Sequence, residues 1–166
     1  VIHGAVIRLS NAYGAPTDKS VNCWMLVVQD LCRQAAQTGK LVLQTTGLQQ
    51  RDFVCMSEVC RVAEALVVTD GVSIKFPIFN VGTGMSQSVL EMAVLIQQRC
   101  VLILGFEPDL EYKKDVADEK HLALAYSNDR LTSIGISLKS INNIKEIDRL
   151  LQFCQIAFTQ SQSKNA

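Results

Sequence analysis

Strand-like runs alternate with helix-like segments along almost the whole chain, and this alternation limits the folds open to it. Short apolar runs that end in turn-forming residues predict strands at residues 6–9, 41–45, 77–81, 110–113 and 122–126. Apolar residues spaced three and four apart predict helices at residues 21–38, 58–68, 89–104 and 144–158, with a brief helix between Ser127 and Gly135. Strands that alternate with helices favour an α/β fold.

Local signals mark where several of these elements begin and end. Ser88 and Glu91 have the spacing of a capping box at the start of the third long helix. Ser57 is expected to cap the second helix in a similar position. After the first strand we expect a loop over residues 11–16, because Pro16 stops regular structure. A second loop, which contains Arg51, is expected to lead into the second helix.

Length and composition narrow the class of protein further. The 166 residues suit one domain, which we expect to span residues 1–160, with a frayed polar tail at 161–166. Lysine plus arginine equals aspartate plus glutamate, 16 of each, so no overall charge recruits nucleic acid or anionic lipid. No apolar run approaches the roughly twenty residues that a membrane helix needs. The composition therefore predicts neither a nucleic-acid nor a membrane partner.

The cysteines predict a reducing environment. There are six, with no Cys-x-x-Cys pair among them, and most lie on apolar faces of predicted helices. An even count permits disulfides, but buried free cysteine behaves as a small hydrophobe. We therefore expect reduced, structural thiols and a cytoplasmic location. His3 and His121 have no neighbouring ligand at metal spacing, so no metal site is predicted.

Two polar residues in the expected loops are candidates for ligand binding. Asn11 follows a strand, where asparagine is commonly a turn former. Arg51 lies between a strand and a helix, where ligand contacts concentrate, and its guanidinium suits bidentate recognition of phosphate. The alternative for Arg51 is a solvated surface residue that pairs with Asp52. We expect Asp52 to orient its segment and not to act in acid–base chemistry.

Both candidates belong to longer motifs, Arg8-x-x-Asn11-x-Tyr13-Gly14-x-Pro16 and Gly47-x-x-x-Arg51-Asp52-Phe53-Val54. These motifs resemble two stretches of the extended short-chain dehydrogenase/reductases, the NAD-dependent enzymes that epimerise or dehydrate nucleotide sugars. The implied fold is the C-terminal part of a Rossmann-type parallel sheet, interleaved with a small α/β substrate-binding domain.

The resemblance also implies a role for each motif. In the family the first strand passes beneath the nicotinamide ring, which would place Leu9 and Ser10 near the cofactor, NAD or NADP. The family's asparagine contacts the sugar-nucleotide diphosphate, a role that would fall to Asn11. The family's arginine grips the same diphosphate, and Arg51 occupies its position.

The chain departs from the family pattern in several places. Ala15 is inserted before Pro16, and Gln44-Thr45-Thr46 stands where relatives often have aromatic or acidic residues. Many relatives have a second arginine, often before Pro-Gly, where this chain has Lys113-Lys114-Asp115-Val116. Lys114 would supply a point charge without the fork geometry, or be half of a solvated basic pair. Residues 79–86 resemble the family's Asn-Val-Gly-x-Gly segment, but Gln87 stands where a third glycine would complete a phosphate-binding fingerprint. We therefore expect a tight turn there.

No Tyr-x-x-x-Lys and no dinucleotide-binding glycine loop occur in the chain, so no catalytic residue is predicted. The resemblance, which spans Arg8 to about Cys154, implies the substrate-binding C-terminal half of a nucleotide-sugar epimerase, dehydratase or reductase, inactive alone. The missing N-terminal half would bind most of the cofactor, and the intact enzyme is expected to be a homodimer. Two alternatives stay open: a non-catalytic relative that binds a nucleotide or a protein, and a free-standing interaction module that uses helix 144–158.

Overall fold

Parallel strand pairs dominate the fold, which is seen in a computed structural model that describes residues 4–68, 78–114, 124–138 and 143–159. β1 (Val6–Leu9) pairs in parallel with β5 (Ile78–Val81), and β3 (Lys40–Val42) pairs in parallel with β7 (Asp109–Glu111). β4 (Gln50–Cys55) lies between β2 (Asn11–Tyr13), which is parallel to it, and β6 (Ser86–Ser88), which is antiparallel.

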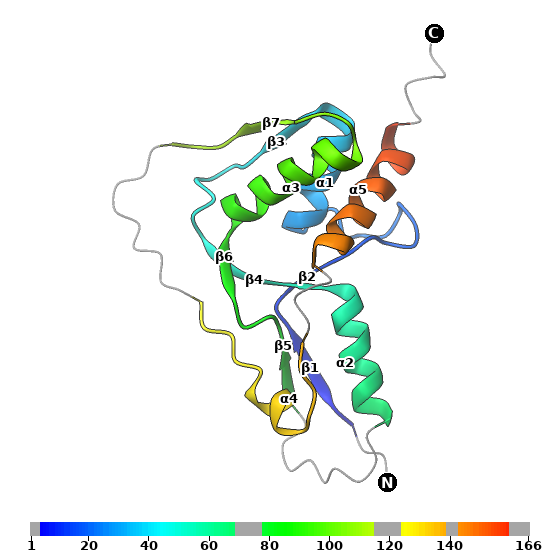
Figure 1. The fold of residues 1–166 in the computed structure, drawn as a ribbon, viewed down its shortest axis with the longest axis vertical. Helices are drawn as coiled ribbons and strands as arrows, with labels where there is room; N and C mark the ends of the chain where they lie inside the picture. Colours follow the sequence, from blue (N-terminus) through cyan, green and yellow to red (C-terminus); the bar gives the residue numbers. More distant parts are fainter. Residues whose placement is uncertain (1–3, 69–77, 115–123, 139–142, 160–166) are drawn as a thin grey trace.

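The helices form two groups, one on each side of the β2–β4–β6 sheet (Figure 1). The upper group in the view consists of α1 (Val27–Thr38), α3 (Val89–Ile103) and α5 (Asn143–Thr159), next to β3 and β7. The lower group consists of α2 (Met56–Val68) and α4 (Asp129–Ser133), next to β1 and β5.

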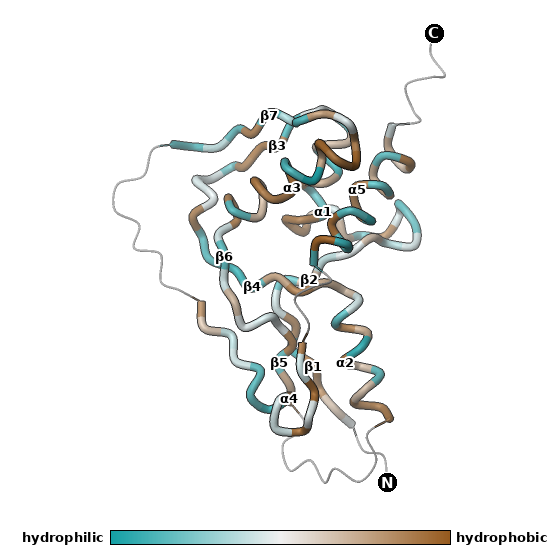
Figure 2. Tube along the Cα trace, viewed as in Figure 1, coloured by the Kyte–Doolittle hydropathy of each residue, from teal (hydrophilic) through white to brown (hydrophobic). Residues whose placement is uncertain are grey.

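Each group encloses its own apolar core, and apolar positions recur along the elements of both (Figure 2). The upper core contains Leu31, Ile96 and Leu150, one from each of its helices. The lower core contains Phe79 of β5 and Leu131 of α4. Burying a side chain of this size contributes about 1.5–3 kcal/mol, so the helices are stabilised mainly by these cores.

The structure confirms the α/β fold class and several expected elements. β1 coincides with the predicted strand, and α3 begins with the predicted capping box. Ser88 Oγ accepts a hydrogen bond from Glu91 N at 3.0 Å, and the Glu91 carboxylate accepts one from Ser88 N at 2.6 Å. All six cysteines are free thiols, and burial raises the pKa of Cys100 and of Cys154 to about 12.

The predicted start of the first helix is wrong. α1 begins at Val27, and residues 21–26 form turns. The apolar spacing continues through these turns because Trp24 packs on α5 by tertiary contacts. Its ring centroid lies 6.1 Å from that of Phe153, and its indole N–H donates to Lys19 O at 2.8 Å.

The predicted cap of the second helix is wrong as well. α2 begins at Met56, so Ser57 lies inside its first turn and cannot precede it. The Ser57 hydroxyl lies 3.2 Å from the Cys55 sulfur. β4 runs directly into α2, and no loop residue is left to cap the helix.

The candidate residues of both expected loops lie in strands, whereas residues 14–16 are irregular as expected. Asn11 begins β2, and Arg51 lies within β4. These segments contain several polar residues, so their sequences do not show the apolar pattern of a strand. Pairing between two segments that are distant in the sequence stabilises them as strands. Conversely, the described part of the expected strand at 122–126 is irregular, and the Tyr126 hydroxyl donates to Arg8 O at 2.8 Å.

Some expectations lie outside the described residues: those for His3, His121, residue 77, residues 122–123 and the tail at 161–166. None of the helices in the described part combines the length and the apolar composition that a bilayer crossing requires. The described His, Cys, Asp and Glu side chains form no group of three or more that could hold a metal ion.

Candidate functional site

β2 and β4 bring the two main candidates, Asn11 and Arg51, onto neighbouring strands. The register pairs Asn11 with Phe53, which lies two positions beyond Arg51 on β4. Side chains alternate along a strand, so Arg51 and Phe53 share one face. Phe53 is 3% exposed and belongs to the upper core, whereas Arg51 is exposed. Arg51 therefore lies on the same face of β4 as the buried Phe53, at the end of that face that is exposed to solvent.

The Arg51 guanidinium has few contacts within the chain. Its Nη1 donates to Gln50 O at 3.3 Å. Among the described residues, no carboxylate lies within ion-pair distance of it. The alternative in which Arg51 pairs with Asp52 does not hold in this structure, because the two side chains point to opposite faces of β4. An exposed guanidinium with five N–H donors therefore retains donors for an external acceptor.

Asn11 is exposed but not free of contacts. Its Nδ2 donates to the backbone oxygen of Asp52 at 3.1 Å. A side-chain amide has a second N–H and an acceptor oxygen, which leaves capacity for a ligand. The contact fixes the Asn11 side chain beside the segment of β4 that carries Arg51.

Asp52 has the structural position that its motif led us to expect. It is fully buried, at 0% exposure. One carboxylate oxygen accepts a hydrogen bond from Thr83 N at 2.9 Å, and the other accepts from Gly84 N at 2.7 Å and from Thr83 Oγ1 at 3.1 Å. Residues 82–85 connect β5 to β6 through bends at Gly82 and Gly84, and β6, which the sequence did not predict, leads into α3; the bent segment 82–84 is called the turn below. Asp52 therefore holds this turn against β4.

Leu9 and Ser10, the candidate cofactor contacts, lie at the end of β1. Leu9 is 44% exposed. The Ser10 N–H donates to Val81 O at 3.0 Å, but its buried hydroxyl has no hydrogen-bond partner within the part of the chain that the structure describes. A buried hydroxyl without a partner is costly. The Leu9 side chain is therefore accessible at the end of β1, and the Ser10 hydroxyl is unsatisfied among the described residues.

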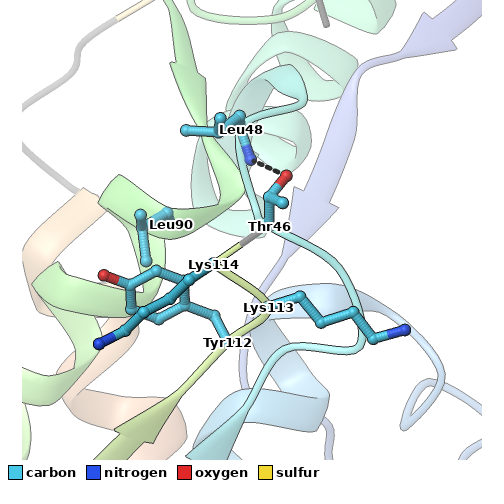
Figure 3. Close-up of a pocket in the computed structure, with 6 residues that line it drawn as sticks. All are labelled: Thr46, Leu48, Leu90, Tyr112, Lys113 and Lys114. Carbon is cyan, nitrogen blue, oxygen red and sulfur yellow. Dashed lines mark hydrogen bonds between the residues drawn. The ribbon is translucent and has the colours of Figure 1, made fainter. Parts of the chain in front are cut away.

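Lys114, the third candidate for substrate binding, lines a pocket of about 250 Å³. Thr46, Leu48, Leu90, Tyr112 and Lys113 form the rest of the lining. Figure 3 shows the Lys114 side chain along the Tyr112 ring, with the Lys113 ammonium pointing the opposite way. Arg51 does not line this pocket, but Thr46 and Leu48 belong to the segment that leads into β4.

The sequence interpretation missed most of this pocket. Neither Tyr112 nor Thr46 was among the candidate binding residues. Their meeting depends on the parallel pairing of β3 with β7, which a single sequence does not indicate. The one usable signal was the Lys113-Lys114 pair directly after the predicted strand.

Comparisons with solved structures show which proteins share this fold. An NAD-dependent NDP-hexosamine 5,6-dehydratase, TunA, matches with a TM-score of 0.65 at 22% identity, over 92% of this chain and 46% of that chain. The UDP-N-acetylglucosamine 4-epimerase from Methanobrevibacter ruminantium M1 matches with a TM-score of 0.65 at 18% identity, over 89% and 44%. RMD from Pseudomonas aeruginosa, solved with NADPH, matches with a TM-score of 0.66 at 18% identity, over 92% and 48%. No protein-family model and no curated protein sequence matches the chain.

These matches define a class of fold, the Rossmann-type α/β fold of NAD-dependent nucleotide-sugar enzymes. The resemblance to the extended short-chain dehydrogenase/reductases, which two motifs carry in the sequence, is confirmed at the level of the fold. The chain spans less than half the length of each of the three matched chains.

Proposed function

We propose that this chain is the substrate-binding half of an NAD(P)-dependent nucleotide-sugar epimerase, dehydratase or reductase, and that it grips the sugar-nucleotide diphosphate. The observation that carries the proposal is the placement of Arg51. Its guanidinium is exposed on a strand anchored between two cores, has no carboxylate partner among the described residues, and has Asn11 on the neighbouring strand. Solved proteins of similar fold include MoeE5 in complex with UDP-glucose and NAD.

Each residue has a distinct part in this proposal. Arg51 donates two parallel hydrogen bonds to a phosphate group, which its planar fork allows. Asn11 donates to a neighbouring phosphate or sugar oxygen through its second amide hydrogen. Lys114 adds a point charge from the pocket of about 250 Å³, whose Tyr112 ring offers an apolar face to the nucleotide.

The cofactor, NAD or NADP, would contact this chain through Leu9 and Ser10. Leu9 gives the ring an apolar surface, and the Ser10 hydroxyl gains the partner that it lacks among the described residues. When bound, the nicotinamide supplies hydride transfer. The sequence contains no glycine cradle for the pyrophosphate and no Tyr-x-x-x-Lys pair for proton transfer. We therefore expect the chain alone to be inactive. The resemblance to the family leads us to expect that the intact enzyme is a homodimer, and the cysteine pattern leads us to expect that it is cytoplasmic.

Titration with UDP tests the proposal. Arg51→Ala should weaken UDP binding by about 1.5–3 kcal/mol, the range for a hydrogen bond to a charged group, or about 10- to 150-fold in the dissociation constant. Arg51→Lys should recover part of the loss, because it keeps the charge and loses the fork. Arg149→Ala on α5, which removes an arginine of 66% side-chain exposure, is the matched control. Equal UDP affinities for the unmodified chain and Arg51→Ala would show that Arg51 is an ordinary surface residue.

A further inference from the structure

We propose that Asp52 is a positioning residue, which holds Arg51 in its binding orientation and links it to the strand that carries Leu9 and Ser10. The inference rests on the proposed function of Arg51. Asp52 does not touch the ligand in this proposal. It acts through the backbone of β4 and through the turn at residues 82–84.

The first part of the argument is the way Asp52 is fixed from two directions. Its backbone pairs with Ser86 in the antiparallel β4–β6 ladder, where Arg51 pairs with Gln87. Its carboxylate accepts hydrogen bonds from the turn that precedes β6. The backbone pairing with β6 and the carboxylate hydrogen bonds to the turn therefore hold residue 52 together. Because Arg51 is next to Asp52 and points to the opposite face, a rotation of the backbone at Asp52 redirects the guanidinium.

The second part is the requirement for a buried acceptor at this position. Asp52 has no exposed surface, and an ionised carboxylate only accepts hydrogen bonds. An asparagine would present an N–H to one of the two turn amides, Thr83 N or Gly84 N, and leave it without an acceptor. A buried donor that loses its partner costs about 1–3 kcal/mol. The turn would then have to move, and β4 with it.

The third part is the connection to β1. Gly82 lies between Asp52 and Tyr126: a Cβ on Gly82 would be 2.7 Å from Asp52 Oδ1 and 2.6 Å from Tyr126 Cδ1. The Tyr126 hydroxyl donates to Arg8 O at 2.8 Å, and Arg8 Nε donates to Asn80 Oδ1 at 2.9 Å. A continuous set of contacts therefore runs from Asp52 to the residue that precedes Leu9. A displacement at Asp52 reaches both the proposed substrate contact and the proposed cofactor contacts.

A double-mutant cycle with UDP as the titrant tests the positioning role in the full 166-residue chain. Asp52→Asn should weaken UDP binding roughly tenfold. Added to Arg51→Ala, it should cause a smaller further loss than it does in the unmodified chain, because most of its effect passes through Arg51 and the remainder through Asn11, which donates to Asp52 O. Glu64→Gln, the same kind of change at an exposed carboxylate on α2, is the control and should bind UDP as the unmodified chain does. Additive losses in the double variant would overturn the inference, since a merely structural residue lowers affinity whether or not Arg51 is present.

Amide hydrogen exchange gives a readout that needs no ligand. Asp52→Asn should speed exchange at Thr83 and Gly84 roughly tenfold or more relative to the rest of the chain. If Asp52→Asn does not fold, Thr83→Val removes the hydroxyl contact with Asp52, together with the hydroxyl contacts to Met85, and leaves both backbone contacts with Asp52 in place, so it should give a smaller effect of the same kind. Unchanged exchange at Gly84 would overturn the inference even if Arg51 binds UDP. If the unmodified chain fails to bind UDP, both the proposed function and the role of Asp52 are overturned. If it binds UDP and Asp52→Asn binds equally well, only the role of Asp52 is overturned.

Discussion

At the scale of single residues, the pair Arg51–Asp52 shows how strand alternation separates two chemical roles. One side chain is exposed and has no carboxylate partner in the described residues, and the next is fully buried with hydrogen bonds to both oxygens. A helix or a loop would not place neighbours on opposite faces in this way. In β4 the Arg-Asp sequence therefore gives an exposed cation and a buried structural anion, and the two do not form an ion pair.

Gly82 is a position where the structure leaves no room for a side chain. A Cβ there would lie 2.6 Å from Tyr126 and 2.7 Å from Asp52, closer than any real Cβ contact. Gly82→Ala is therefore expected to lower the free energy of unfolding by about 1–3 kcal/mol, the usual cost of overpacking. Urea denaturation measures the change. Gly4→Ala, where no atom lies within 4 Å of the added Cβ, should have little effect. Equal losses for the two variants would contradict the close packing around Gly82.

At the scale of elements, α3 depends on its capping box for a clean start. Hydrogen bonds from the Ser88 backbone N–H, and then from its hydroxyl, lower the pKa of Glu91 below its ordinary value of 4.5. A lowered pKa in the folded state means that the ionised Glu91 stabilises the helix above pH 4.5. This stabilisation is lost as the pH falls through the lowered pKa.

Ser88→Ala tests this pH dependence. At about pH 6 it should cost about 1 kcal/mol, the typical value of an N-cap. Once the pH has fallen through the lowered pKa of Glu91, the difference from the unmodified chain should be smaller, because protonated Glu91 no longer accepts well from residue 88 in either protein. Thermal unfolding at both pH values measures it. Thr132→Ala in α4 is the control. A difference that is the same at both pH values would show that Glu91 takes no part in the cap.

The elements also show what the sequence could predict. The alternation of strands and helices, β1 and the start of α3 follow from local patterns, and the structure confirms them. The starts of α1 and α2 could not be predicted from local patterns. Trp24 precedes α1 but is fixed by contacts with α5, and β4 runs directly into α2. β2 and β4 were missed since each is stabilised by the other. Asn11 and Arg51 could be named from their motifs, but the pocket around Tyr112 depends on pairing between β3 and β7.

At the scale of the whole molecule, β4 divides the protein into its two cores. Phe53 and Cys55 belong to the upper core, and Val54 between them belongs to the lower one. The candidate residues sit at this junction, where Arg51 continues the face of Phe53 and Asp52 continues the face of Val54. Relative movement of the two cores would therefore change the proposed site more than movement within either core.

The junction also determines which part of a dinucleotide this chain can bind. Its only Gly-x-Gly sequence is at residues 82–84, and the N–H groups of Thr83 and Gly84 already donate to Asp52. They are not available to a pyrophosphate, which needs unpaired backbone amides at a helix start. We therefore expect the chain to bind UDP and to show no saturable binding of NADH at micromolar concentration, with no epimerase turnover. Fluorescence titration of NADH, run beside the UDP titration on the same preparation, measures both. Micromolar affinity for NADH in the unmodified chain would mean that the cofactor has a binding site here other than the contacts at Leu9 and Ser10.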